Sequence, residues 1–184
     1  MRTSRQSALC LVLLQTLLAL PAANAQQQPR PDVPQAIQVP MGEDVILVAH
    51  AAGSQIYTCQ SAPDGKFMWT LKAPDAQLMD GKNNVIGSHF AGPAWRLKDG
   101  SEVTGKAVAH VDSLDPDSIA WLLVKVVGHA GEGQLTKVTT IQRIHTHAGK
   151  APAQGCDQSH LNSETKSSYT ADYYFYAPAK STFD

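Results

Sequence analysis

Short runs of β-branched and aromatic residues, separated by tight turns, recur from Val39 almost to the end of the chain. Three pairs of runs flank turn signals: 55–59 and 67–71 around Pro63-Asp64-Gly65, 94–97 and 103–108 around Asp99-Gly100, and 121–127 and 138–144 around a glycine-rich stretch. Asp and Gly suit such turns because glycine takes positive φ without strain and Asp tolerates it. With a last strand expected at 169–176, these hairpins predict an all-β domain of antiparallel strands, either a sandwich or a closed barrel, with little helix.

One segment fits the strand pattern less simply. Leu135, Val138, Ile141 and Ile144 recur every three residues, which is closer to helical spacing than to strand alternation. The same segment is rich in β-branched residues, which favours a strand with a bulge that turns its face.

The first 25 residues have the pattern of a Sec-type signal peptide. Arg2 and Arg5 precede a short apolar core that ends at Leu20, and Ala23-Asn24-Ala25 supplies small residues before a cleavage site after Ala25. The sequence therefore predicts a periplasmic or extracellular protein whose mature part has no membrane span. Residues 26–37 are polar and Pro-rich, so we expect a flexible leader, followed by a single β domain over 38–184.

The charge balance argues against a nucleic-acid partner. The signal holds two of the 15 basic residues and none of the 16 acidic ones, which leaves 13 basic against 16 acidic residues and a net charge of −3. Nucleic-acid-binding proteins normally carry a basic surface instead. The same balance argues against attraction to an anionic membrane surface.

Two cysteines, Cys59 and Cys156, remain once Cys10 leaves with the signal. An even number of cysteines in an oxidising compartment predicts one disulfide between them.

The segment from Gly87 to Trp95 is the first candidate site. Its Gly and Pro residues shape a backbone that ordinary residues could not follow, with His89 and Trp95 beside it and Asp99 and Ser101 closing the adjacent hairpin. One interpretation is a ligand cleft in which Trp95 stacks on a small molecule or glycan and His89, Asp99 and Ser101 supply polar contacts. The other is a structural corner with a core Trp and a His that bonds to the backbone.

His145 and His147 are the second candidate site. Alternate residues of a strand share a face, so both imidazoles could reach one Cu or Zn ion, with His89 as a third ligand. The alternative is that both are exposed polar residues at a strand end. No cofactor is otherwise expected from the sequence.

Signatures of a specific reaction are missing from the sequence. There is no Gly-x-Ser-x-Gly, no phosphate loop and no Gly-x-Gly-x-x-Gly after a strand. A hydrolase or isomerase would need an unrecognised acid–base pair, for which His89 and Asp172 are candidates.

Several motifs in order resemble a known family. They are Gln55-Ile56-Tyr57-Thr58-Cys59, the segment Gly87 to Trp95 with Asp99-Gly100-Ser101, Ala120-Trp121-Leu122-Leu123, 138–143 and 169–176. Over about residues 38 to 176 the chain is similar to the "domain of unknown function 3455" family of secreted bacterial and fungal proteins. This resemblance implies a shared fold and export but brings no established activity, and His145-Thr146-His147 departs from the family pattern.

The expected function is therefore that of an exported, non-catalytic module that binds a small molecule, a glycan or an envelope protein. A periplasmic Cu- or Zn-binding protein that uses His145 and His147 is the alternative, and a hydrolase or isomerase is the third hypothesis.

Overall fold

The computed structural model describes residues 28–180 of the 184-residue chain. The predicted signal peptide at 1–25, with its cleavage site after Ala25, lies outside the described residues. Within 28–180, no helix is long and apolar enough to cross a membrane.

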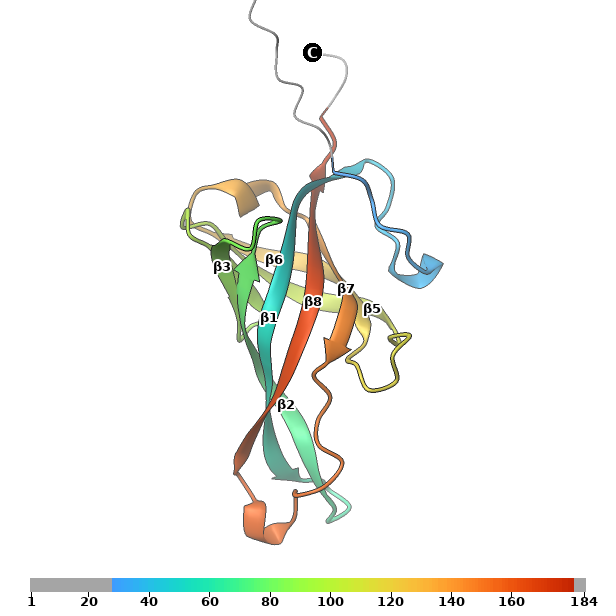
Figure 1. Ribbon diagram of the computed structural model, residues 1–184, viewed down its shortest axis with the longest axis vertical. Coiled ribbons are helices and arrows are strands. Elements are labelled where there is room, and N and C mark those ends of the chain that lie inside the picture. Colours follow the sequence, from blue (N-terminus) through green and yellow to red (C-terminus); the bar gives the residue numbers. More distant parts are fainter. Residues whose placement is uncertain (1–27, 181–184) are drawn as a thin grey trace, which may run out of the picture.

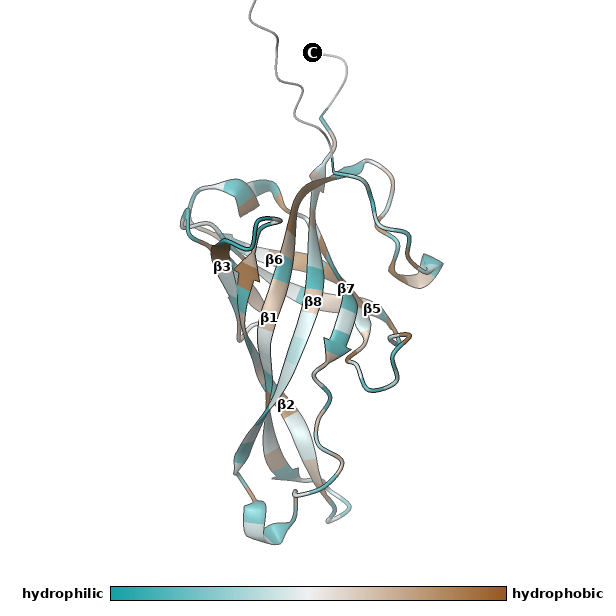
Figure 2. Cartoon of the chain, viewed as in Figure 1, coloured by the Kyte–Doolittle hydropathy of each residue, from teal (hydrophilic) through white to brown (hydrophobic). Residues whose placement is uncertain are grey.

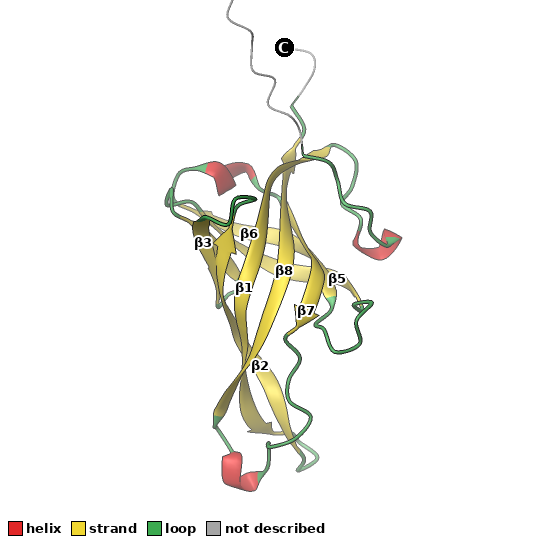
Figure 3. Cartoon of the chain, viewed as in Figure 1, coloured by secondary structure: helices red, strands yellow, loops and turns green. Residues whose placement is uncertain are grey.

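The described chain consists almost entirely of strands (Figure 1, Figure 3). The strands are β1 (Glu43–Ser61), β2 (Phe67–Met79), β3 (Val85–Phe90), β4 (Ala94–Leu97), β5 (Glu102–Val111), β6 (Trp121–Ala130), β7 (Thr140–Ala148) and β8 (Glu164–Pro178). The helical segments of this part of the chain are three short 3-10 turns, η1 (Gln35–Ile37), η2 (Gln134–Lys137) and η3 (Gln158–His160).

Each strand pairs antiparallel with the next, and β8 pairs antiparallel with β1, so the sheet closes into a barrel. The all-β prediction is confirmed, and the closed barrel is the architecture that forms. Within the barrel, closure removes the sheet edges that would otherwise expose unpaired backbone groups.

The hairpins form at the turns that the sequence predicts. Gly65 has φ 78° and its N–H donates to Ala62 O at 2.9 Å, while Gly100 has φ 92° and donates to Leu97 O at 3.1 Å. Positive φ at these two glycines explains why the turns need glycine.

The three-residue spacing at 135–144 has a structural explanation. Leu135 lies in η2 and Val138 directly follows it; Val138 N–H donates to Leu135 O at 3.0 Å, because a 3-10 helix has three residues per turn. Ile141 and Ile144 lie on β7, where an odd spacing puts them on opposite faces. Ile141 accordingly packs in the main core, and Ile144 packs in a separate cluster on the outside of the barrel.

Alternation along the strands fills the barrel. On β8, the buried Tyr169, Ala171, Tyr173 and Phe175 belong to the main core, as strand geometry requires of every second residue. Hydrophilic and hydrophobic bands follow one another along β1, β7 and β8 in Figure 2.

The segment predicted as a flexible leader differs from that expectation where the structure describes it. Val33 and Ile37 are buried against the outer face of the barrel beside Ile144, Trp121 and Tyr174. Gln142 Nε2 on β7 donates to Ile37 O at 2.6 Å. The few apolar residues of this polar segment cover outward-facing apolar side chains of β5 to β8 that water would otherwise contact.

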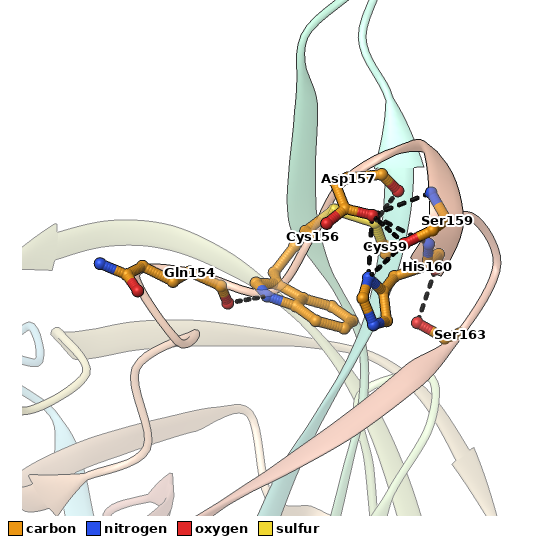
Figure 4. Close-up of a disulfide and its surroundings, with 8 residues drawn as sticks. Cys59, Gln154, Cys156, Asp157, Ser159, His160 and Ser163 are labelled. Carbon is orange, nitrogen blue, oxygen red and sulfur yellow. Dashed lines mark hydrogen bonds and ion pairs between the residues drawn. A yellow bond between two sulfur atoms is a disulfide. The ribbon is translucent and has the colours of Figure 1, made fainter.

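Beyond the barrel, β1, β2 and β8 continue as a narrow twisted arm, visible at the bottom of Figure 1. We call this part of the three strands the arm; it begins where β2, which pairs with β3 only over 76–79, runs on without that neighbour. The predicted disulfide is confirmed near the tip of the arm. It joins Cys59 on β1 to Cys156 in the loop before β8, with 5.3 Å between the Cα atoms (Figure 4).

Candidate functional site

A cavity of about 580 Å³ occupies the barrel interior at the end from which the arm projects. Every one of the eight strands contributes to its wall. The lining residues are Gln55, Leu71, Lys72, Ala73, Pro74, His89, Gly92, Pro93, Trp95, Gly105, Lys106, Ala107, Leu122, Val124, Arg143 and Tyr173. This volume lies within the range of small-molecule sites, roughly 300–1,000 Å³.

His89 and Trp95 stand side by side in the cavity wall. They are cross-strand partners on β3 and β4, and their rings stack with centroids 4.4 Å apart and planes 9° apart. Both are almost completely buried, at 3% and 1% exposure. The structure therefore brings together the two aromatic members of the first predicted site.

Burial keeps the His89 ring neutral. Loss of solvent lowers the pKa of His89 to about 4, although its bond to Ala94 acts in the opposite direction. Because a carbonyl only accepts, Nδ1 carries the proton and donates to Ala94 O at 2.9 Å. His89 Nε2 is then an acceptor, and near neutral pH the ring is an uncharged aromatic surface.

Asp99 and Ser101, the other two residues predicted for this site, lie outside the cavity lining. Asp99 accepts hydrogen bonds from the Ser101 hydroxyl at 2.6 Å and from Gln134 N–H at 2.7 Å, and Ser101 Oγ accepts from Leu135 N–H at 3.2 Å. The Gln134 N–H and then Ser101 lower the pKa of the Asp99 carboxyl. These bonds fasten the β4–β5 turn to η2.

His145 and His147 lie on the outside of the barrel, separated by its wall from His89. A bulge in the β7–β8 pairing falls between Ile144 and His147, and His145 has φ 49°, so the regular alternation that would align the two rings is broken. His145 Nδ1 instead lies 2.9 Å from Asp172 Oδ2.

His145 shares Asp172 with His50, a histidine that the sequence analysis did not identify as a site residue. His50 Nδ1 lies 2.9 Å from Asp172 Oδ1, so one carboxylate holds two imidazoles. Across residues 28–180, no group of three or more His, Cys, Asp or Glu is arranged to hold a metal ion. Asp172 and His89, the two candidates for an acid–base role, lie on opposite faces of the barrel wall.

Gln55, Arg143 and Tyr173 are among the cavity residues that the sequence did not predict as site residues. Arg143 projects from the inward face of β7, and its Nε and Nη2 donate to Ala120 O at 3.2 and 2.8 Å. Burial raises the pKa of Tyr173, and the nearby Arg143 charge opposes that rise. A sequence signal existed for Arg143, because alternation from Ile141 turns position 143 inward.

The charges around the cavity have one sign. Lys72, Lys106 and Arg143 are its charged lining residues, and no acidic side chain of the described chain lines it. Lys72 is paired with Glu164 at 2.5 Å. Within residues 28–180, Arg143 forms no ion pair, so the cavity wall carries an uncompensated positive charge.

Two buried donors of the cavity wall also have no partner within the described chain. They are Gln55 Nε2, on a residue that is 2% exposed, and Trp95 Nε1. More than about 90% of buried polar groups in proteins are hydrogen-bonded, so two such donors on one wall call for a partner.

Comparison with known proteins assigns the chain to a family and goes no further. Searches of the curated proteins and of the solved structures found no match. The sequence profile of one family matches residues 40–177, which include all eight strands except the last residue of β8. The protein therefore belongs to the family described as "Protein of unknown function (DUF3455)".

Proposed function

We propose that this protein is an exported, non-catalytic binding module that holds a small molecule inside its barrel. The observation that carries this proposal is a pair of buried, unpartnered donors, Gln55 Nε2 and Trp95 Nε1, on two residues that line the cavity. Leaving a buried donor unpaired costs about 1–3 kcal/mol, so a fold that retains two of them beside a cavity suits a ligand that supplies acceptors.

The wall of the cavity supports the same proposal. Apolar side chains such as Leu122, Val124 and Pro93 surround a few polar groups, which is the usual composition of a small-molecule site. Because all eight paired strands contribute, the site is pre-formed and a ligand would lose little affinity to ordering the protein.

Binding fits this wall better than catalysis does. A pair of carboxylates for acid–base chemistry is lacking among the described lining residues. His89 donates through Nδ1 to a backbone carbonyl, which fixes the ring as part of the wall.

Export is the second part of the proposal. The Cys59–Cys156 disulfide supports it, because disulfides persist in oxidising compartments such as the periplasm and the extracellular space. The signal-peptide pattern of the first 25 residues points the same way.

A blocked cavity tests the binding proposal. Ala107 and its neighbour Val108 are both exposed, Val108 at 57%. Ala107 lines the cavity and Val108 does not. The probes are 2-naphthoate, 2-naphthamide and 2-naphthylmethylammonium, which share one flat apolar body and differ in charge. We expect at least one probe to bind the wild type, and Ala107→Trp to weaken that binding on the order of tenfold or more by filling the cavity, as measured by calorimetry.

Val108→Trp is the matched control, since it adds the same side chain one residue away, and it should bind like the wild type. Failure of all three probes to bind, or equal binding by Ala107→Trp and the wild type, would overturn the proposed function.

A further inference from the structure

The residues that line the cavity include buried donors and one unpaired positive charge. Gln55 Nε2 and Trp95 Nε1 are buried without partners in the described chain, and Arg143 has no ion pair there. Two of the five guanidinium N–H groups donate to Ala120 O, which leaves three for other acceptors. An acceptor with a negative charge would satisfy this wall, and a cation would be repelled by it.

The cavity wall has one unpaired, partly buried positive charge, so it suits a ligand with a single negative charge. Lys72 at the rim is already paired with Glu164, and Lys106 is exposed to solvent, where its charge is screened. Arg143 therefore supplies the one charge that is both partly buried and unpaired. A planar carboxylate matches the fork of a guanidinium better than a point charge does.

The rest of the wall selects a flat apolar body. The stacked rings of His89 and Trp95 present aromatic surface, and Tyr173 lies edge-on to both, with centroid distances of 5.1 and 5.6 Å. Gly105 lets the β5 backbone pack directly against Trp95, since a Cβ there would lie 2.4 Å from Val124 Cγ1 and 3.1 Å from Trp95 Cζ3. Aromatic rings pack well against aromatic surface of this kind.

We infer that the ligand is an aromatic carboxylate, with its carboxylate on Arg143 and the Gln55 amide and its ring against His89 and Trp95. This inference rests on the proposed function, because it names the class of ligand for the same cavity. It goes further because it specifies a negative charge on the ligand and names Arg143 as the residue that binds the charged group.

The test compares the three naphthyl probes on the wild type by calorimetry, so it needs no substitution to be decisive. We expect 2-naphthoate to bind on the order of tenfold or more tightly than 2-naphthamide, because hydrogen bonds to charged groups are the stronger ones. The cation 2-naphthylmethylammonium should bind more weakly than either. Equal affinities for naphthoate and naphthamide, or a preference for the cation, would overturn the inference and leave the proposed function standing.

Substitutions then assign the preference to residues. Arg143→Gln should remove most of the preference for naphthoate over naphthamide, and Arg143→Lys should retain part of it. Lys98→Gln is the matched control, since it removes one positive charge from an exposed residue outside the lining. A preference that survives in Arg143→Gln, or that Lys98→Gln removes equally, would contradict the role of Arg143.

Gln55→Leu gives a second readout that does not require substituting Arg143. The replacement removes an unpartnered buried donor, so the free protein should become more stable in urea unfolding, while the affinity for naphthoate falls about fivefold. A structural role for the amide predicts the opposite change in stability and no change in affinity.

Discussion

Replacing Cys59 and Cys156 together with serine is expected to lower the free energy of unfolding by about 4–5 kcal/mol. The disulfide closes a loop with a sequence separation of 97 residues. In the chain-entropy account, a cross-link across a loop of about 100 residues restricts the unfolded chain by about 4.7 kcal/mol. The bond joins β1 to the loop before β8, so most of the barrel lies inside the closed loop.

Urea unfolding of the wild type and the double variant measures this effect. Added reductant should lower the stability of the wild type toward that of the variant and leave the variant unchanged. Binding of naphthyl probes to the folded variant should persist, because neither cysteine lines the cavity. A loss of less than about 1 kcal/mol would mean that the backbone contacts of the arm, such as Cys59 N–H to Ser163 O at 2.9 Å, hold this loop in place by themselves.

Lowering the pH from 7 to 4 is expected to cost the folded state about 3 kcal/mol through His89 alone. The pKa of His89 is about 4 in the folded protein because the ring is buried, against 6.5 in an unfolded chain. Between these two values the unfolded state binds a proton that the folded state does not. Stability therefore rises with pH from about 4 to 6.5 and is constant, for this group, above that window.

The measurement is the free energy of urea unfolding at several pH values between 4 and 7, compared between the wild type and His89→Phe. Phe keeps an aromatic ring beside Trp95 and cannot titrate. The unfolding free energy lost between pH 7 and pH 4 should therefore be about 3 kcal/mol smaller in His89→Phe than in the wild type. His110→Gln is the control, since His110 is exposed on β5 and should leave the dependence unchanged. Parallel curves for the wild type and His89→Phe would show that His89 is not buried as a neutral ring.

Local features of the fold could be predicted from the sequence. The turns at Gly65 and Gly100 depend on a few adjacent residues whose chemistry is visible in order along the chain. The disulfide followed from the number of cysteines and the predicted compartment. His89 and Trp95 were found together because they lie on consecutive strands joined by a short Gly-Pro turn.

Features that depend on distant pairing could not be predicted in the same way. Arg143 and Tyr173 are cross-strand partners on β7 and β8, and Gln55 on β1 joins them in the cavity wall only because β8 also pairs with β1; no local pattern shows that closure. A bulge before His147 cancels the strand alternation on which the paired-histidine prediction relied. The burial of Val33 and Ile37 depends on an outer apolar surface that four separate strands create.

The most direct test of the central claim, that a small molecule binds inside the barrel, is to follow the three indole N–H signals of 15N-labelled protein by NMR during titration with 2-naphthoate. The chain has three tryptophans. Trp69 Nε1 donates to Gln154 O at 2.9 Å on the arm, Trp121 belongs to the outer cluster with Ile37, and Trp95 lines the cavity with an unpartnered Nε1. Phe substitutions at positions 69 and 121 assign the signals. We predict that the Trp95 signal moves progressively and the other two stay in place; a Trp95 signal that stays in place while 2-naphthoate is added, with or without movement of Trp69 or Trp121, would contradict binding in the cavity.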